Sequence, residues 1–157
     1  MMIQKSLLTC LLILSQISLY AQIDSLRLKI QFGHKKDVWT VDFSPTQSWI
    51  ASGSADNTIK IWDIDTGREI RTFRGHTGDV EAVSFNNDGK TLISASTDNT
   101  LKLWNTDTGE LIRTFTGHTR AVQAVAFSPS NQYIVSGSAD KTVKIWEVTS
   151  GQLIHTF

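Results

Sequence analysis

Short runs in which apolar and polar residues alternate fill the chain from about residue 37 onward, and clusters of turn-forming residues separate them. Asn87-Asp88-Gly89-Lys90 is one such cluster, and its glycine accepts the positive φ angle that a tight hairpin requires. Strands of four to six residues with turns every ten residues or so predict a four-stranded antiparallel sheet. In the middle of the chain these strands are expected at residues 80–85, 92–96, 101–104 and 111–115.

The four-strand pattern occurs three times without an insertion or a deletion. The Gly-His pair at residues 33–34 recurs at 75–76 and 117–118, so the spacing is 42 residues each time (76 − 34 and 118 − 76). A fixed period of this length indicates one supersecondary unit copied three times. The three units are residues 33–74, 75–116 and 117–157.

Four short strands cannot bury both faces of their own sheet, so the units are expected to stack sheet against sheet. Burial of a Val, Ile or Phe side chain contributes roughly 1.5–3 kcal/mol. Packing between units should therefore dominate the stability of the fold. The expected contact residues are Val41, Phe43, Ile50, Ile59 and Ile61, with their counterparts in the later units.

Composition and charge narrow the class of protein. Apolar residues make up 40% of the 157 residues and charged residues 19%, which is typical of a globular chain. Lys and Arg number 15 and so do Asp and Glu, so the basic surplus that is typical of nucleic-acid binding is missing. Cys10 is the sole cysteine, which excludes an intrachain disulfide and a cysteine-ligated zinc site.

The N-terminal segment has the order of a secretory signal peptide. Lys5 precedes an apolar run over residues 7–19, and the small Ala21 follows. Cleavage after Ala21 would start the mature chain at Gln22 and place it in the periplasm or outside the cell. The run of about 13 residues is shorter than the roughly 20 that a membrane-spanning helix needs. A buried core helix, a retained anchor and a lipoprotein linked through Cys10 remain alternatives.

A Gly-His pair near the start of each unit, an Asp before the third strand and a closing Trp-Asp pair resemble the WD-repeat β-propeller family. The closing pair is Trp62-Asp63 in the first unit, but Trp104-Asn105 and Trp146-Glu147 in the others. The resemblance covers residues 33–157 and implies an all-β fold of three four-stranded antiparallel propeller blades in an open or partial ring. The first blade would have strands 37–43, 48–54, 58–63 and 68–74. Residues 22–32 would be one extra N-terminal outer strand of an incomplete blade.

The resemblance also implies one hydrogen-bonded tetrad of His, Ser, Asp and Trp in each unit. An indole N–H only donates, a carboxylate only accepts, and a hydroxyl and a neutral imidazole do both, so the four groups can be linked in a chain. The tetrads would be His34, Ser52, Asp56 and Trp62; His76, Ser94, Asp98 and Trp104; and His118, Ser136, Asp140 and Trp146.

Ser, His and Asp in one unit could also be a hydrolase triad. An active site is rarely copied three times at a fixed spacing with a Trp added each time, so we expect a structural role and no enzyme. His155 replaces Arg71 and Arg113 in the repeat and is expected to be exposed on an outer strand. The sequence predicts no catalytic residue, no cofactor and no metal site.

Three blades are fewer than the four to eight that usually close a propeller. The chain could be a fragment of a larger propeller, a truncated reading frame or an oligomer that shares one ring. Two open apolar faces predict that the chain associates with itself.

The leading function is a non-catalytic protein–protein interaction scaffold that is part of a larger exported propeller protein. The alternatives are the propeller portion of an enzyme or sensor whose active region lies outside this chain, and a purely structural element. The resemblance implies partner binding on the face that carries the loops between successive blades and the loops between the second and third strands of each blade. The candidate residues there are Asp37, Trp39, Ala55, Asp79, Glu81, Thr97, Ala121, Gln123 and Ala139.

Trp39 is the most informative of these candidates, because Glu81 and Gln123 occupy its place in the later units. A Trp at a position that is otherwise polar is expected to face solvent, where it can anchor a protein or peptide partner. Asp37, Asp79 and Glu81 would favour a basic partner. The alternative is that Trp39 only covers a neighbouring loop or the edge of a missing blade.

Overall fold

The computed structural model describes residues 33–157, and every strand that it describes lies in the second of the two compact units of the chain, His34–Phe157. The predicted signal peptide at residues 1–21 and the predicted outer strand at residues 22–32 lie outside the described residues. The strands are β1 (Val38–Phe43), β2 (Trp49–Ser54), β3 (Thr58–Asp63), β4 (Glu69–Arg74), β5 (Val80–Phe85), β6 (Thr91–Ser96), β7 (Thr100–Asn105), β8 (Leu111–Thr116), β9 (Val122–Phe127), β10 (Tyr133–Ser138), β11 (Val143–Glu147) and β12 (Leu153–Thr156).

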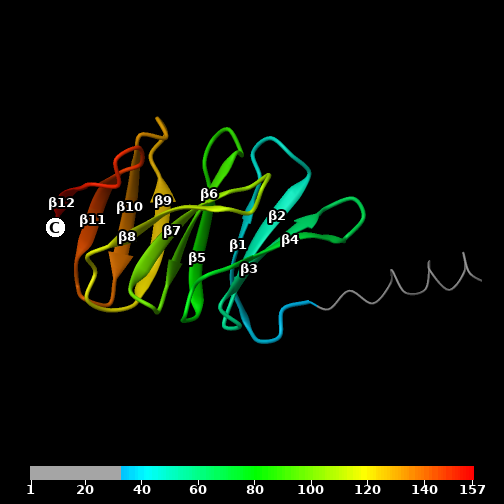
Figure 1. The fold of residues 1–157 in the computed structure, drawn as a ribbon, viewed down its shortest axis with the longest axis horizontal. Helices are drawn as coiled ribbons and strands as arrows, with labels where there is room; N and C mark the ends of the chain where they lie inside the picture. The colour runs from blue at the N-terminus through cyan, green and yellow to red at the C-terminus, as the bar shows by residue number, and fades with distance from the viewer. Residues whose placement is uncertain (1–32) are drawn as a thin grey trace, which may run out of the picture. The chain divides into compact units, whose positions relative to one another are not determined.

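The twelve strands form three separate four-stranded antiparallel sheets, which lie side by side in Figure 1. The first sheet has the order β1-β2-β3-β4, the second β5-β6-β7-β8 and the third β9-β10-β11-β12. Within each sheet, every strand pairs only with the strands next to it in the sequence. The predicted fold class, three four-stranded antiparallel blades that do not close into a ring, is confirmed for the described residues. None of these residues forms a helix long and apolar enough to cross a membrane.

The turns have the conformations that the sequence requires. Gly89, between β5 and β6, has φ 70°, which a residue with a Cβ rarely adopts. The turn between the second and third strands of each sheet has one residue in the same left-handed region. This residue is Asn57, Asn99 or Lys141, with φ between 66° and 71°. Asparagine tolerates this conformation better than lysine does, which explains why two of the three copies use it.

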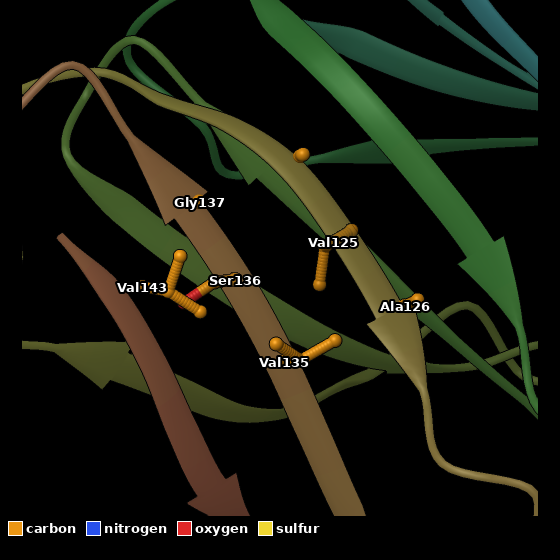
Figure 2. Close-up of a pocket in the computed structure, with 7 residues that line it drawn as sticks. Val125, Ala126, Val135, Ser136, Gly137 and Val143 are labelled. Carbon is orange, nitrogen blue, oxygen red and sulfur yellow. The ribbon is translucent and has the colours of Figure 1, made fainter. Parts of the chain in front are cut away.

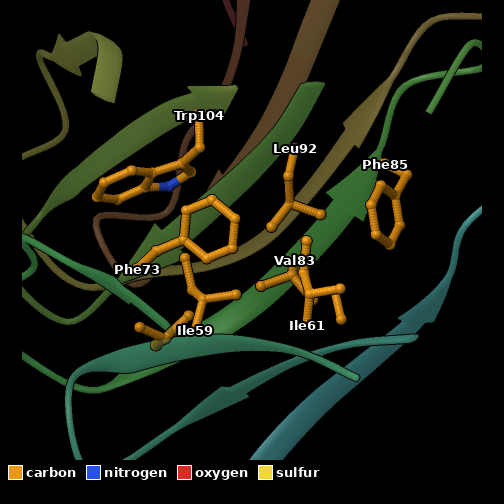
Figure 3. Packing of buried hydrophobic residues seen from close by; sticks show 9 residues of the cluster. Ile59, Ile61, Phe73, Val83, Phe85, Leu92 and Trp104 are labelled. Atoms are coloured by element: carbon orange, nitrogen blue, oxygen red, sulfur yellow. The ribbon is translucent and has the colours of Figure 1, made fainter. Parts of the chain in front are cut away.

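Two hydrophobic clusters lie where neighbouring sheets meet. In the first, Ile59, Ile61 and Phe73 of the first sheet pack with Val83 and Phe85 of the second, as Figure 3 shows. The second cluster joins the second and third sheets in the same way around Ile93, Leu101, Phe115, Val122 and Trp146. The prediction that packing between units forms the core is therefore correct for these two junctions.

One part of the predicted contact set is wrong. Val41 is 64% exposed and Phe43 67% exposed, although their counterparts Val83 and Phe85 are buried. Val41 and Phe43 lie on the outer face of the first sheet, where no other described sheet packs against them. The alternating pattern assigned them to the correct face but could not tell whether that face has a neighbour.

Polar contacts at the outer strands also join the sheets. Arg71 of β4 donates from Nη1 to the carbonyl oxygen of Thr108, at 2.9 Å, in the turn after β7. Arg113 of β8 makes the matching contacts to the carbonyl oxygens of Ser150 (2.8 Å) and Thr149 (2.9 Å). Each arginine thus connects the outer strand of its sheet to a turn of the next sheet.

Candidate functional site

The second sheet contains a chain of hydrogen bonds that runs from an indole to a carboxylate. Trp104 Nε1 donates to Ser94 Oγ at 2.8 Å, and Ser94 Oγ lies 2.7 Å from His76 Nε2. His76 Nδ1 lies 2.7 Å from Asp98 Oδ2. Because an ionised carboxylate only accepts, His76 must carry its proton on Nδ1, which leaves Nε2 to accept from the serine hydroxyl.

The same arrangement occurs in the other two sheets. In the first sheet, the Trp–Ser, Ser–His and His–Asp distances are 2.8, 2.7 and 3.1 Å. In the third sheet they are 2.9, 2.8 and 2.8 Å. The structure therefore brings together the twelve residues that the resemblance grouped into tetrads. They are His34, Ser52, Asp56 and Trp62; His76, Ser94, Asp98 and Trp104; and His118, Ser136, Asp140 and Trp146.

A fifth residue in each sheet, a threonine that the sequence analysis missed, donates hydrogen bonds to the Asp of the tetrad. Thr100 donates from Oγ1 to Asp98 Oδ1 at 2.6 Å, and its backbone N–H donates to the same oxygen at 3.0 Å. The backbone N–H of Thr77 donates to the other carboxylate oxygen at 3.1 Å. Thr58 and Thr142 take the place of Thr100 in the other sheets. Their 42-residue spacing was visible in the sequence, but threonine is common in strands, so its recurrence alone did not indicate a role in the tetrad.

In the second and third units, the glycine of the Gly-His pair has a packing role. Gly75 has φ 151° and Gly117 has φ 150°. A Cβ added to Gly75 would lie 3.1 Å from the ring of Trp104, and one added to Gly117 would lie 3.1 Å from the ring of Trp146. Glycine therefore lets the chain pass close to the tetrad indole of its own sheet.

A β-bulge lies at the start of the first strand of each sheet. Val38 pairs with Ser54 and Thr40 pairs with Gly53, so Trp39 has no partner across the ladder. Glu81 and Gln123 are left unpaired at the same place in the second and third sheets. A bulge bends its strand and redirects the side chain of the extra residue. Trp39 lies at the bulge of the first sheet and is 54% exposed.

The other predicted partner-binding residues lie at the same end of the sheets as the bulges. The backbone N–H of Ala55 donates to the carbonyl of Asp37, Thr97 to Asp79, and Ala139 to Ala121, each at 2.9 Å. We call this end the bulge rim. It comprises Asp37, Trp39, Ala55, Asp79, Glu81, Thr97, Ala121, Gln123 and Ala139. Ala55 is only 8% exposed, so its side chain offers almost no contact surface.

The repeat pattern of the WD40 family (WD domain, G-beta repeat) matches residues 26–63, 67–105 and 109–147. These three matches cover well over half of the chain. The chain belongs to the WD40 family. Each match ends at the third strand of a sheet, and the second and third matches each span one outer strand and the first three strands of the next sheet.

Several curated proteins are similar to this chain over a segment of 47 residues. Eukaryotic translation initiation factor 3 subunit I from Neurospora crassa is 51% identical over 47 residues, and that from Pyricularia oryzae is 55% identical over 47 residues. The same subunit from Botryotinia fuckeliana is 49% identical over 47 residues. Each match covers 30% of this chain and 14% of the relative.

These relatives contradict the predicted localisation. They are named as subunits of a translation initiation factor, so the prediction of export to the periplasm or the extracellular space is wrong. That prediction depended on an apolar run of about 13 residues after a lysine. A run of this length carries too little information to separate an export signal from other apolar segments.

The hydrogen bonds of the tetrads lower the pKa values of the three tetrad carboxylates. Burial raises the pKa of Asp98, but hydrogen bonds from His76, from Thr100 and from the backbone N–H of Thr77 outweigh it, so the pKa lies well below its usual value. The pKa values of Asp56 and Asp140 are lowered as well, since the hydrogen bonds they accept again outweigh burial.

Lowering the pH is expected to unfold the chain through these carboxylates. A carboxyl group whose pKa is lower in the folded state adds stability above its unfolded pKa, and this stability is lost as the pH falls below about 4. Urea unfolding at a series of pH values from 7 downward measures the effect. Asp98→Asn removes one such group and should make the loss below pH 4 shallower. If the stability of Asp98→Asn falls below pH 4 as steeply as that of the wild type, the Asp98 carboxylate does not contribute to the acid unfolding.

The order Ser–His–Asp in each tetrad is that of a hydrolase triad, but the serine is inaccessible. Ser94 is 0% exposed, and its hydroxyl oxygen already accepts the Trp104 indole N–H. A substrate carbonyl therefore has no path to the oxygen that would attack it. Within residues 33–157, no group of three or more His, Cys, Asp or Glu side chains is placed to hold a metal ion.

Proposed function

We propose that this WD40 chain is a non-catalytic protein-interaction scaffold that binds a protein or peptide partner at the bulge rim. The tetrads and the two hydrophobic clusters keep the sheets rigid. The rim residues vary between the repeats and take no part in the tetrads, so they are free to recognise a partner. The fold alone does not establish binding, so the proposal depends on the chemistry of the rim.

The observation that carries the proposal is the exposed indole of Trp39. The indole is 54% exposed, and leaving this apolar surface in water is costly. Ladder pairs hold the strand on both sides of the bulge, so Trp39 needs little further ordering when a partner binds. Residues of this kind are common anchors at protein interfaces. The role of the tetrads is then structural, because their serines are buried.

The charges of the rim favour a basic partner. Asp37 is exposed, and Asp79 and Glu81 are half-buried at the same end of the neighbouring sheet. A lysine or arginine of a partner could pair with these carboxylates and lie over the indole. The curated relatives are named as subunits, which supports a role as one component of a larger assembly. Since the matches cover 14% of those relatives, we transfer no specific assembly from them.

Trp39→Ala is expected to weaken binding of a short Arg- and Lys-rich peptide by about 2 kcal/mol, or roughly 30-fold in affinity, because the indole is the anchor. Glu81→Lys should also weaken binding, because it reverses a charge. Titration calorimetry with this peptide and with an acidic peptide of equal length measures both effects.

Gln47→Ala is the control, because Gln47 is exposed in the turn at the opposite end of the first sheet. It should bind the basic peptide as the wild type does. All three variants should keep the wild-type urea midpoint. If Trp39→Ala and Glu81→Lys both bind the basic peptide as tightly as the wild type, the rim is not the binding site.

A further inference from the structure

The outer face of the first sheet exposes apolar residues that are buried elsewhere in the repeat. Val38, Val41 and Phe43 are 49%, 64% and 67% exposed. Their counterparts in the second sheet, Val80, Val83 and Phe85, are 0%, 6% and 6% exposed. We call Val38, Val41 and Phe43 the first-sheet face. In the second and third sheets, the residues at the equivalent positions face the preceding sheet.

The outer face of the third sheet shows the complementary pattern. Val135, Val143 and Phe157 are 39%, 42% and 71% exposed, and we call them the third-sheet face. Their counterparts are at most 2% exposed, and these are Ala51, Ile59 and Phe73 in the first sheet and Ile93, Leu101 and Phe115 in the second.

A hollow of about 280 Å³ lies on this third-sheet face. Its lining includes Val135, Gly137 and Val143, as Figure 2 shows. The counterparts of these three residues in the second sheet are Ile93, Ala95 and Leu101, and each of them is larger. The hollow leaves room on this face for the apolar side chains of another sheet.

The counterparts of the two faces pack against each other inside the chain. One cluster joins Ala51, Ile59 and Phe73 of the first sheet to Val80, Val83 and Phe85 of the second. The second cluster repeats the arrangement, with Val122 buried and Val125 and Phe127 packed against Ile93, Leu101 and Phe115. The first-sheet face and the third-sheet face are therefore the two halves of an interface that the chain already forms twice.

We propose that a second copy of this chain packs its first-sheet face on the third-sheet face, head to tail, and that two copies close one ring. Such an interface is heterologous, and it gives a closed ring when the rotation between copies allows it. The described residues of two copies supply six sheets, which lies within the four to eight blades of closed propellers, and those of three copies would supply nine. Association covers both apolar faces of both copies.

The junction between copies differs from the internal junctions in one polar contact. Arg71 and Arg113 reach carbonyl oxygens in a turn of the following sheet. His155 occupies their place in the third sheet, and the shorter imidazole lacks the two-pronged donor group of arginine. The turn around Thr66 of the second copy would be the acceptor. The copies should therefore be held less tightly than neighbouring sheets within one chain.

Sedimentation equilibrium of the full chain tests the proposal. The wild type is expected at twice the 17.5 kDa mass of one chain. Val41→Glu and Val143→Glu each put a charge on one face, at positions that are 64% and 42% exposed in the single chain, so each variant should fold but sediment as a monomer. A mixture of the two should form a dimer, because one intact face of each kind remains.

His155→Arg restores the missing donor and should lower the dissociation constant of the dimer by about tenfold, as expected for one hydrogen bond from a charged group. Trp39→Ala should leave the dimer unchanged, so failure of the rim proposal and failure of this one are distinguishable. A monomeric wild type overturns the proposal and indicates that another blade or another protein covers the faces. It is also overturned if Val143→Glu dimerises as the wild type does, or if the mixture stays monomeric.

Discussion

Replacing Trp104 by alanine is expected to lower the free energy of unfolding by about 3–5 kcal/mol, the usual cost of truncating a buried aromatic side chain. Trp104 is 1% exposed and packs edge to face on Phe73 of the neighbouring sheet, with ring centroids 5.7 Å apart. Its indole N–H also donates to Ser94. Truncation removes the contact between the Trp104 ring and Phe73 at the junction of the first and second sheets. It also removes the hydrogen-bond donor to Ser94 in the tetrad.

Urea unfolding compares this variant with two controls. Trp39→Ala makes the same chemical change at an exposed position and should alter the free energy of unfolding by less than about 0.5 kcal/mol. Trp104→Phe keeps an aromatic ring but loses the indole N–H, so its effect should lie between the two. Equal losses for Trp39→Ala and Trp104→Ala would mean that the junction contributes no more than surface contacts.

Replacing Asp98 by alanine is expected to cost about 1–3 kcal/mol, because it leaves buried donors without their acceptor. The Asp98 carboxylate accepts hydrogen bonds from His76 Nδ1 at 2.7 Å and from the Thr77 backbone N–H at 3.1 Å. It also accepts from Thr100 Oγ1 at 2.6 Å. Its loss therefore affects the entry to the second sheet and the turn between β6 and β7 at once.

The control for Asp98→Ala is Asp107→Ala, since Asp107 is an exposed carboxylate in another turn of the same sheet. It should leave the unfolding midpoint within error of the wild type at neutral pH. Asp98→Asn keeps an acceptor oxygen and should cost less than the alanine variant. A wild-type midpoint for Asp98→Ala would contradict a structural role for this tetrad.

The strands and turns were predictable because local rules specify them. The alternating apolar residues of β5 and the glycine of its following turn fix a hairpin without reference to the rest of the chain. The grouping of His76, Ser94, Asp98 and Trp104 came from the family resemblance and the 42-residue period. No local rule brings these four residues together, because they lie in separate strands and loops.

The features that the sequence analysis missed depend on how strands pair within a sheet and on which sheets lie next to each other. The bulge at Trp39 is a property of the register between β1 and β2, which the sequence of β1 alone does not determine. The contact from Arg71 to Thr108 joins two sheets and requires their relative position. In the same way, alternation assigned Val41 to an apolar face but could not show that this face is open.

The pairing of each strand with its sequence neighbour has a consequence for how the chain folds. No ladder in the described residues joins strands that are distant in sequence, so each sheet can form by closing short loops only. Folding rates rise as contacts become more local. During synthesis, each sheet can therefore assemble as soon as its own four strands are available. It gains most of its stability when the next sheet covers its apolar face. The order of translation is thereby also the order of assembly.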